Sequence, residues 1–221
     1  MFFLPFLNTI SLYVNTINKQ ADCMQEKKKR MTNAERTQAM RVNLLDVARR
    51  FFSEKGYGAT STPEIVAAAK VTRGALYHHF EDKLALFRAV VEREAECVAS
   101  AIQEDGSAGE DILNTLKIGS EVYFKAMREP GRSHLLLVEG PAVLGLREMN
   151  NIMAVRDGEQ LRLGLQGLLQ HDPNLPLDAL SDVLAAAFDR AAFAVAEGRP
   201  EEKYRQAIDA ILTAIYKDAS S

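Results

Sequence analysis

Residues 60–83, TSTPEIVAAAKVTRGALYHHFEDK, constrain the fold of this chain more than any other stretch. They predict two short helices joined by a tight turn. Residues 61–64, Ser-Thr-Pro-Glu, fit a capping box with proline in the first helical turn. Thr72 is placed to cap the second helix, and Leu76 and Phe80, four residues apart, would hold that helix on a core.

The second short helix also carries polar side chains that this core does not need. Arg73, Tyr77 and His78 would project outward, and the next helix opens at Lys83. This layout is typical of a helix-turn-helix whose second helix enters the DNA major groove. The alternative is an ordinary helical hairpin with Tyr77 in the core, which leaves the exposed polar residues unexplained. The residues predicted to contact DNA are Ser61, Thr62, Thr72, Arg73, Gly74, Ala75, Tyr77, His78 and Lys83.

Within this set, Arg73, with Gly74 and Ala75 at the start of the helix, would meet base edges. The hydroxyl, histidine and lysine side chains would bind phosphates and fix the register. The charge distribution supports contact with a polyanion. Residues 1–90 hold 14 Lys and Arg against 8 Asp and Glu, whereas residues 91–221 hold 13 against 22.

At these residues the chain resembles the TetR family of one-component bacterial transcriptional regulators. The resemblance spans roughly residues 41–91 and is clearest at residues 44–52 (LLDVARRFF), 74–80 (GALYHHF) and 83–87 (KLALF). The family usually has glycine where this chain has Lys70. If Lys70 is left-handed there, the conformation costs about 1 kcal/mol.

The resemblance implies an all-α fold with a three-helix DNA-binding domain and a larger helical domain that binds an effector and dimerises. We predict domain boundaries at 34–83 and 84–221. The implied partners are a double-stranded, near-palindromic DNA operator, a second copy of the chain and a small-molecule effector that releases a repressor from DNA. Control by a protein partner instead of a small molecule, and activation instead of repression, remain open.

The body of the chain has helical periodicity and no sustained alternation, so it predicts helices at 84–105, 112–127, 143–170, 177–197 and 201–217 and no strands. A mostly apolar effector cavity with a few polar groups is predicted from Phe124, Met127, His134, Leu137, Met149, Met153, Arg156 and Phe188. Ordinary core packing is the alternative for each of these residues.

The last two helices carry broad apolar faces rich in alanine, which suit a four-helix bundle formed by two subunits. The resemblance implies a dimer interface at the same place. Its predicted members are Leu184, Phe188, Ala191, Ala192, Val195, Ile208, Ile211, Leu212 and Ile215. Burial within a single chain is the alternative.

Other classes of function find little support in the sequence. Cys23 and Cys97 lack metal-ligand spacing, and the four histidines form no HxxE or HxxxH pair. There is no glycine-rich phosphate loop and no Gly-x-Ser-x-Gly elbow. We therefore expect no metal, no cofactor and no enzymatic activity, in a reduced, cytoplasmic protein.

Residues 1–33 form a separate extension. Residues 1–17 are apolar but interrupted by polar side chains, and they are shorter than the roughly 20 residues needed to span a bilayer. A basic run follows at 27–30. We expect a flexible segment or a translation start placed too far upstream, with Met24 or Met31 as the natural start; a membrane-associating arm is the alternative.

Overall fold

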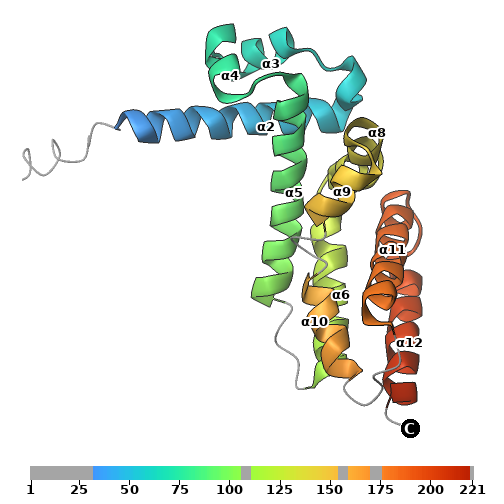
Figure 1. Ribbon diagram of the computed structural model, residues 1–221. Coiled ribbons are helices and arrows are strands. Elements are labelled where there is room, and N and C mark those ends of the chain that lie inside the picture. Colours follow the sequence, from blue (N-terminus) through green and yellow to red (C-terminus); the bar gives the residue numbers. More distant parts are fainter. Residues whose placement is uncertain (1–31, 106–110, 154–158, 170–175, 220–221) are drawn as a thin grey trace, which may run out of the picture. The chain divides into compact units, whose positions relative to one another are not determined.

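The computed structural model describes residues 32–105, 111–153, 159–169 and 176–219 (Figure 1). The chain forms two compact units, residues 1–42 and 43–221. No strand occurs in the described ranges, so the prediction of an all-α fold is confirmed. The helices are α2 (Asn33–Ala59), α3 (Thr62–Ala69), α4 (Arg73–His79), α5 (Lys83–Asp105), α6 (Ile112–Met127), α7 (Arg132–His134), η1 (Leu135–Glu139), α8 (Gly140–Leu144), α9 (Leu146–Met153), α10 (Glu159–Leu168), α11 (Leu177–Ala196) and α12 (Glu201–Ala219).

The described part of the first unit, residues 32–42, is the beginning of α2. Glu35 and Thr32 cap it reciprocally: the Thr32 N–H donates to Glu35 Oε2 at 2.6 Å, and the Glu35 N–H donates to Thr32 Oγ1 at 3.2 Å. This arrangement satisfies two of the N–H groups that the start of any helix leaves without a partner.

In the second unit, three helices close a small core around α2 from Leu44 onward. Phe52 of α2 and Phe87 of α5 are fully buried, with ring centroids 5.0 Å apart and edge to face. Leu76 of α4 is also fully buried, as its spacing from Phe80 predicts. Gly56 interrupts α2, because its φ of 76° is not helical, and one further turn reaches Ala59.

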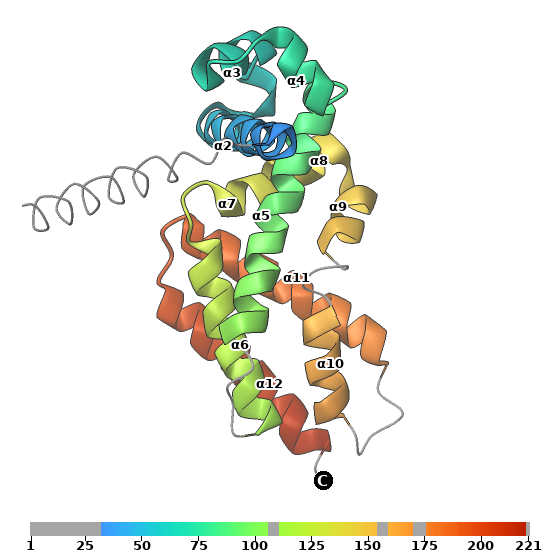
Figure 2. The same cartoon turned by 90° about the vertical axis from the view of Figure 1, so that its left-hand side faces the viewer.

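The body is a bundle in which α6 packs against α5, α10 and α12, and α11 packs against α10 and α12 (Figure 2). Its core is made of large apolar side chains from separate helices. Examples are Phe124 of α6, Leu165 of α10 and Leu212 of α12, each at most 1% exposed. The predicted helices at 112–127, 177–197 and 201–217 match α6, α11 and α12 to within two residues.

The prediction of one helix over residues 143–170 is wrong. Gly145, with φ 86°, ends α8, and α9 begins directly after it. Residues 154–158 lie outside the described ranges, and α10 covers 159–168. The preceding segment is irregular too, because residues 135–139 form a π-helical turn, η1, in which hydrogen bonds span five residues. Apolar periodicity alone does not reveal such breaks.

Candidate functional site

The helix-turn-helix is built from local contacts that its sequence specifies. Ser61 caps α3, and the reciprocal hydrogen bonds of the predicted capping box are both present, at 3.0 Å and 3.4 Å. Lys55 also donates to Glu64 at 2.9 Å. The hydrogen bond from Lys55, followed by those from Ser61, lowers the pKa of Glu64 to about 2, so this carboxylate stays ionised.

Local contacts also determine the turn and the second helix. Among the described residues, Lys70 is the one non-glycine residue with a positive φ. Its φ of 55° and ψ of 40° are left-handed, which is the conformation considered above for this position. Thr72 caps α4, and its Oγ1 accepts the Ala75 N–H at 3.1 Å. Gly74 is exposed, and an added Cβ there would meet only Thr72 Oγ1, at 3.9 Å, so the start of α4 is open to close approach.

Three of the predicted DNA-contacting residues come together on the exposed surface of α3 and α4. The Arg73 guanidinium carbon lies 5.5 Å from the centroid of the Tyr77 ring. Hydrogen bonds from the side chains of Thr62 and then Arg73 lower the pKa of the Tyr77 hydroxyl. Tyr77 is 40% exposed, so this contact orders the surface without removing it from solvent.

The remaining predicted residues surround this group. His78 is exposed at the end of α4, with its ring centroid 5.4 Å from that of His79. The ammonium group of Lys83, at the start of α5, lies 4.1 Å from the centroid of the Tyr57 ring. The exposed face therefore offers hydroxyl, guanidinium, imidazole and ammonium donors, which suit phosphate oxygens and base edges.

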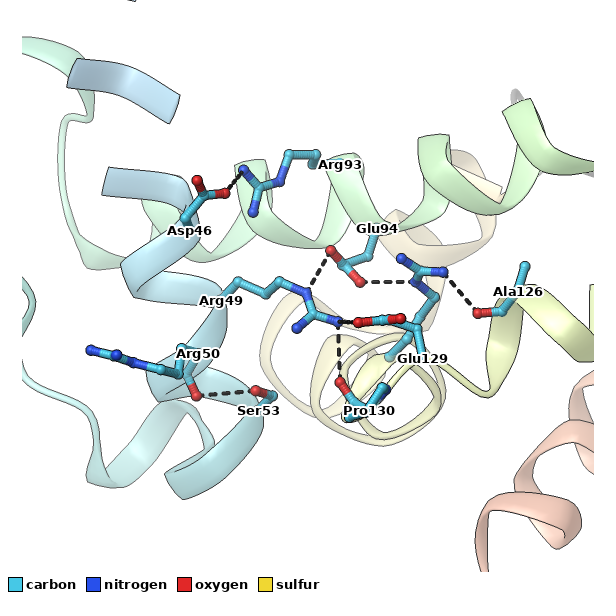
Figure 3. Close-up of polar contacts among 10 residues, drawn as sticks. Asp46, Arg49, Arg50, Ser53, Arg93, Glu94, Ala126, Glu129 and Pro130 are labelled. Atoms are coloured by element: carbon cyan, nitrogen blue, oxygen red, sulfur yellow. Dashed lines mark hydrogen bonds and ion pairs between the residues drawn. The ribbon is translucent and has the colours of Figure 1, made fainter. Parts of the chain in front are cut away.

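A buried carboxylate joins the helix-turn-helix domain to the body, and no local pattern in the sequence marks it. Glu94 of α5 is 2% exposed and accepts from Arg49 Nε at 2.8 Å and from Arg132 Nε at 2.9 Å (Figure 3). Arg49 also donates to the Pro130 carbonyl at 3.1 Å, and Arg132 to the Ala126 carbonyl at 2.7 Å. Burial alone would raise the pKa of Glu94, but the two guanidinium hydrogen bonds outweigh it and lower the pKa.

A second contact links the same two regions. Glu139, at the end of η1, accepts the backbone N–H of Tyr57 at 2.7 Å. Its Oε1 lies 3.7 Å from His134 Nε2. A Cβ added at Gly56 would meet Glu139 Oε1 at 2.9 Å, so a side chain at this position would displace the carboxylate. Residues of η1 itself also line a cavity in the body.

That cavity has a volume of about 1350 Å³ and lies among α5, α6, η1, α9, α10 and α11. Of the residues predicted to form an effector site, Leu137, Met149, Met153 and Phe188 line it. Phe124, Met127 and His134 do not, and Arg156 lies outside the described residues. Phe124 and Met127 are buried in the core, and His134 is exposed beside Glu139.

The cavity also has polar lining residues that the sequence analysis missed, above all Tyr123 and Asp189. The Tyr123 hydroxyl donates to Asp189 Oδ1 at 2.7 Å. Burial raises the pKa of Asp189, and the hydrogen bond from Tyr123 opposes that rise. The two residues are 66 positions apart, so no local pattern marks them as a pair.

The residues predicted for a dimer interface differ in their exposure. Leu184, Phe188, Ala191, Ala192, Ile208 and Leu212 are buried within one chain. Val195 and Ile215 are half-buried, and Ile211 is 41% exposed. The apolar faces predicted on α11 and α12 therefore pack largely against the body of the same chain, and the dimer interface stays a prediction.

Two other features bear on function. The described residues contain no cluster of three or more His, Cys, Asp or Glu side chains suited to a metal ion. In the same ranges no helix combines the length and the hydropathy that a bilayer crossing requires.

Comparison with known proteins agrees with the helix-turn-helix geometry. The model of the family "Bacterial regulatory proteins, tetR family" matches residues 44–90, and that of the "Tetracyclin repressor-like, C-terminal domain" matches residues 113–216. The crystal structure of a TetR-family transcriptional regulator from Pectobacterium atrosepticum is 30% identical, with a TM-score of 0.63. The match covers 84% of this chain and 95% of that one.

Two curated relatives show how the similarity is distributed. The HTH-type transcriptional repressor Rv1474c of Mycobacterium tuberculosis is 27% identical over 181 residues, which are 78% of this chain and 91% of the relative. The HTH-type transcriptional regulator AcrR of Shigella flexneri is 53% identical over 55 residues, which are 25% of this chain and 26% of the relative.

The fold and the exposed second helix define a DNA-binding protein of the helix-turn-helix class. The chain belongs to the TetR family of transcriptional regulators.

Proposed function

We propose that this protein is a dimeric repressor that binds a near-palindromic operator and leaves it when a small molecule occupies the body. The observation that carries the proposal is the wall shared by the two regions: η1 lines the cavity and ends in Glu139, which holds the backbone of Tyr57 in the helix-turn-helix. We propose residues 34–83 as the DNA-binding domain and residues 84–221 as the effector and dimerisation domain.

DNA contact would be divided by chemistry. Arg73, with Gly74 and Ala75 at the open start of α4, reads base edges; a bidentate arginine–guanine pair gives about 1–3 kcal/mol of discrimination. Phosphates are bound by the surrounding donors. These are Ser61, Thr62, Thr72, Tyr77, His78 and Lys83, which carry no sequence information themselves.

A pair of variants tests this division. Arg73→Ala is expected to relax the preference for one base pair in each half-site, whereas Lys83→Ala is expected to weaken binding to all sequences alike. Fluorescence anisotropy with the preferred duplex and single-base variants of it measures both effects. Identical base preferences for wild type and Arg73→Ala would contradict the assignment of base reading to Arg73.

Dimerisation would use the outward faces of α11 and α12. Val183 is 66% exposed and Ile211 is 41% exposed, and alanines at 207 and 214 extend the apolar surface of α12. TetR-family regulators bind DNA, typically as dimers. Light scattering is expected to give a dimer for the wild type and a monomer for a variant with both Val183→Glu and Ile211→Glu. A monomeric wild type would defeat this part of the proposal.

Release from DNA would act through Glu139. A ligand that contacts Leu137 or Val138 shifts η1, and with it the acceptor of the Tyr57 N–H. Such a ligand weakens DNA binding only if it binds the released state more tightly than the DNA-bound state. The volume and the largely apolar lining of the cavity favour a small molecule over a protein as the controlling partner.

The variant Glu139→Gln tests this coupling, because it keeps the shape of the side chain and removes its charge. A compound that releases the wild type from DNA is expected to bind this variant equally well and to release it less. Full release of the variant at the same ligand concentration would show that the signal does not pass through Glu139.

A further inference from the structure

We propose that the cavity takes an apolar compound that carries a cationic nitrogen, and that Asp189 receives this nitrogen. The inference rests on the proposed function, because it names the chemical class of the effector for the same cavity.

Asp189 is the first reason. It lines the cavity from α11, and its Oδ1 accepts the Tyr123 hydroxyl at 2.7 Å. Among the described residues, no donor contacts its other oxygen, Oδ2. Burial raises the pKa of Asp189, which means that its ionised form lacks sufficient compensation in the unliganded protein. A cation beside Oδ2 would supply the missing compensation.

The hydroxyl groups of the lining are the second reason. Thr115, Ser120 and Ser181 each donate to a carbonyl four residues earlier in their own helix, at 2.8 Å in every case. Each hydroxyl has a single hydrogen, so these groups can offer only acceptors to a ligand. The same holds for Tyr123, whose hydrogen is directed at Asp189. The interior of the cavity therefore suits a ligand that donates hydrogen bonds.

The hydrogen-bond donors among the lining residues do not offset this excess of acceptors. Arg190 lies over Phe193, with its guanidinium carbon 6.0 Å from the ring centroid, and Arg162 has a contact of its own. Gln103, Asn150 and Gln160 also line the cavity, and all three are exposed residues. Three aspartates, at 178, 182 and 189, stand against the two arginines in the lining.

The aromatic and sulfur-containing walls complete the match. Tyr123 and Phe188 meet edge to face, with centroids 5.7 Å apart, next to Asp189. Aromatic faces attract cations, and Met149 and Met153 adapt to irregular apolar shapes. An anionic ligand would instead bring a second negative charge next to a half-buried carboxylate, which is unfavourable at low dielectric.

Two dyes of similar xanthene structure and opposite charge provide the test: rhodamine 6G, a cation, and fluorescein, an anion. Fluorescence anisotropy of each dye is measured with the full-length wild type, Asp189→Asn and Asp182→Asn. The asparagine at 189 keeps the acceptor for Tyr123 and removes the charge. Asp182 is an exposed carboxylate on the same helix and in the same lining, so it is a matched control.

The wild type is expected to bind rhodamine 6G and to bind fluorescein at least about tenfold more weakly, because a charge-assisted contact is worth a factor of this order. Asp189→Asn is expected to weaken rhodamine 6G binding about tenfold, and Asp182→Asn by less than about threefold. Thermal melting confirms that each variant is folded. Equal binding of both dyes, no binding of rhodamine 6G by the wild type, or no effect of Asp189→Asn would overturn the inference.

Adding operator DNA separates this inference from the proposed function. If rhodamine 6G binds through Asp189 but does not release the DNA, ligand-controlled release fails and the chemistry of the site stands. If fluorescein alone releases the DNA, ligand control stands and the inference about a cationic effector fails.

Discussion

Two arginine-bound carboxylates, Asp46 in the helix-turn-helix domain and Glu94 at the junction with the body, lie in opposite environments. Asp46 of α2 is bound by Arg93 at 2.7 Å, yet its side chain remains 63% exposed. Glu94 of α5 is bound by two arginines, and its side chain is 3% exposed. The same pairing chemistry therefore serves different ends. Asp46 stays in water on the surface of the helix-turn-helix domain, whereas Glu94 is buried and fixes how the helices that carry Arg49 and Arg132 meet α5.

The largest expected effect is a loss of stability on substitution of the buried carboxylate, Glu94. Glu94→Gln removes the charge between Arg49 and Arg132 and leaves two poorly compensated guanidinium groups. Breaking a buried ion pair by removing one partner destabilises proteins by about 3–5 kcal/mol, and we expect about 3 kcal/mol because both arginines are partly exposed. Urea denaturation at fixed protein concentration measures the loss.

Asp46→Asn is the matched control in the head, because it removes one charge from an exposed arginine pair. Its expected effect on the free energy of unfolding is below about 1 kcal/mol. Equal losses for the two variants would mean that burial does not distinguish the two regions.

The pH dependence of Glu94 sharpens the same comparison. Because its pKa is lowered in the folded protein, Glu94 contributes stability above the ordinary carboxyl pKa of 4.5, and that contribution disappears as the pH falls through the folded value. The difference in unfolding free energy between wild type and Glu94→Gln should therefore be greatest near neutral pH. Below about pH 4.5 it should shrink; a constant difference across the acid range would argue against an ionised Glu94.

A smaller effect tests how much local contacts stabilise the helix-turn-helix domain. Thr72→Ala removes the hydroxyl that accepts the Ala75 N–H at the start of α4. Loss of such a cap is expected to cost about 1 kcal/mol, whereas Thr72→Ser should stay close to wild type. Chemical denaturation compares the two variants. If alanine and serine behave alike, the cap contributes nothing measurable to the stability of the head.

The smallest effect is a gain in stability. Lys70 has φ 55°, a conformation that glycine adopts without a steric penalty. Lys70→Gly is expected to stabilise the protein by about 0.5–1 kcal/mol, after allowance for the greater freedom of glycine in the unfolded chain. Lys70→Ala keeps a Cβ and should show no comparable gain in the same urea titration. A loss of stability on Lys70→Gly would indicate that the lysine side chain makes a contact worth more than the backbone strain.

The contrast also explains what the sequence could predict. The capping box at residues 61–64 and the cap at Thr72 depend on residues within four positions of one another, so they were predicted from the sequence. The left-handed Lys70 was raised only through the resemblance to a family that usually has glycine there. Glu94 depends on Arg49 and Arg132, 45 and 38 positions away, and no periodic pattern encodes that meeting. The paired Tyr123 and Asp189 were missed for the same reason.

The predicted dimer and effector residues mark a second limit. Leu212 was predicted to lie in a dimer interface and Phe124 to line a cavity, and both are buried in the core of the chain. Periodicity marks an apolar face, but it does not say whether that face meets the same chain, a second copy or a cavity. The break at Gly145 adds to this, because it redirects α9 toward the cavity after α8. Tertiary packing decides these assignments.

Selection of binding sites from a random duplex library with the full-length protein tests the central claim most directly. A dimer that reads DNA through α4 predicts an enriched, near-palindromic motif with two half-sites, and Arg73→Ala predicts the loss of preference at one position in each half. Enrichment of no motif, or of a motif unchanged by Arg73→Ala, would contradict the account.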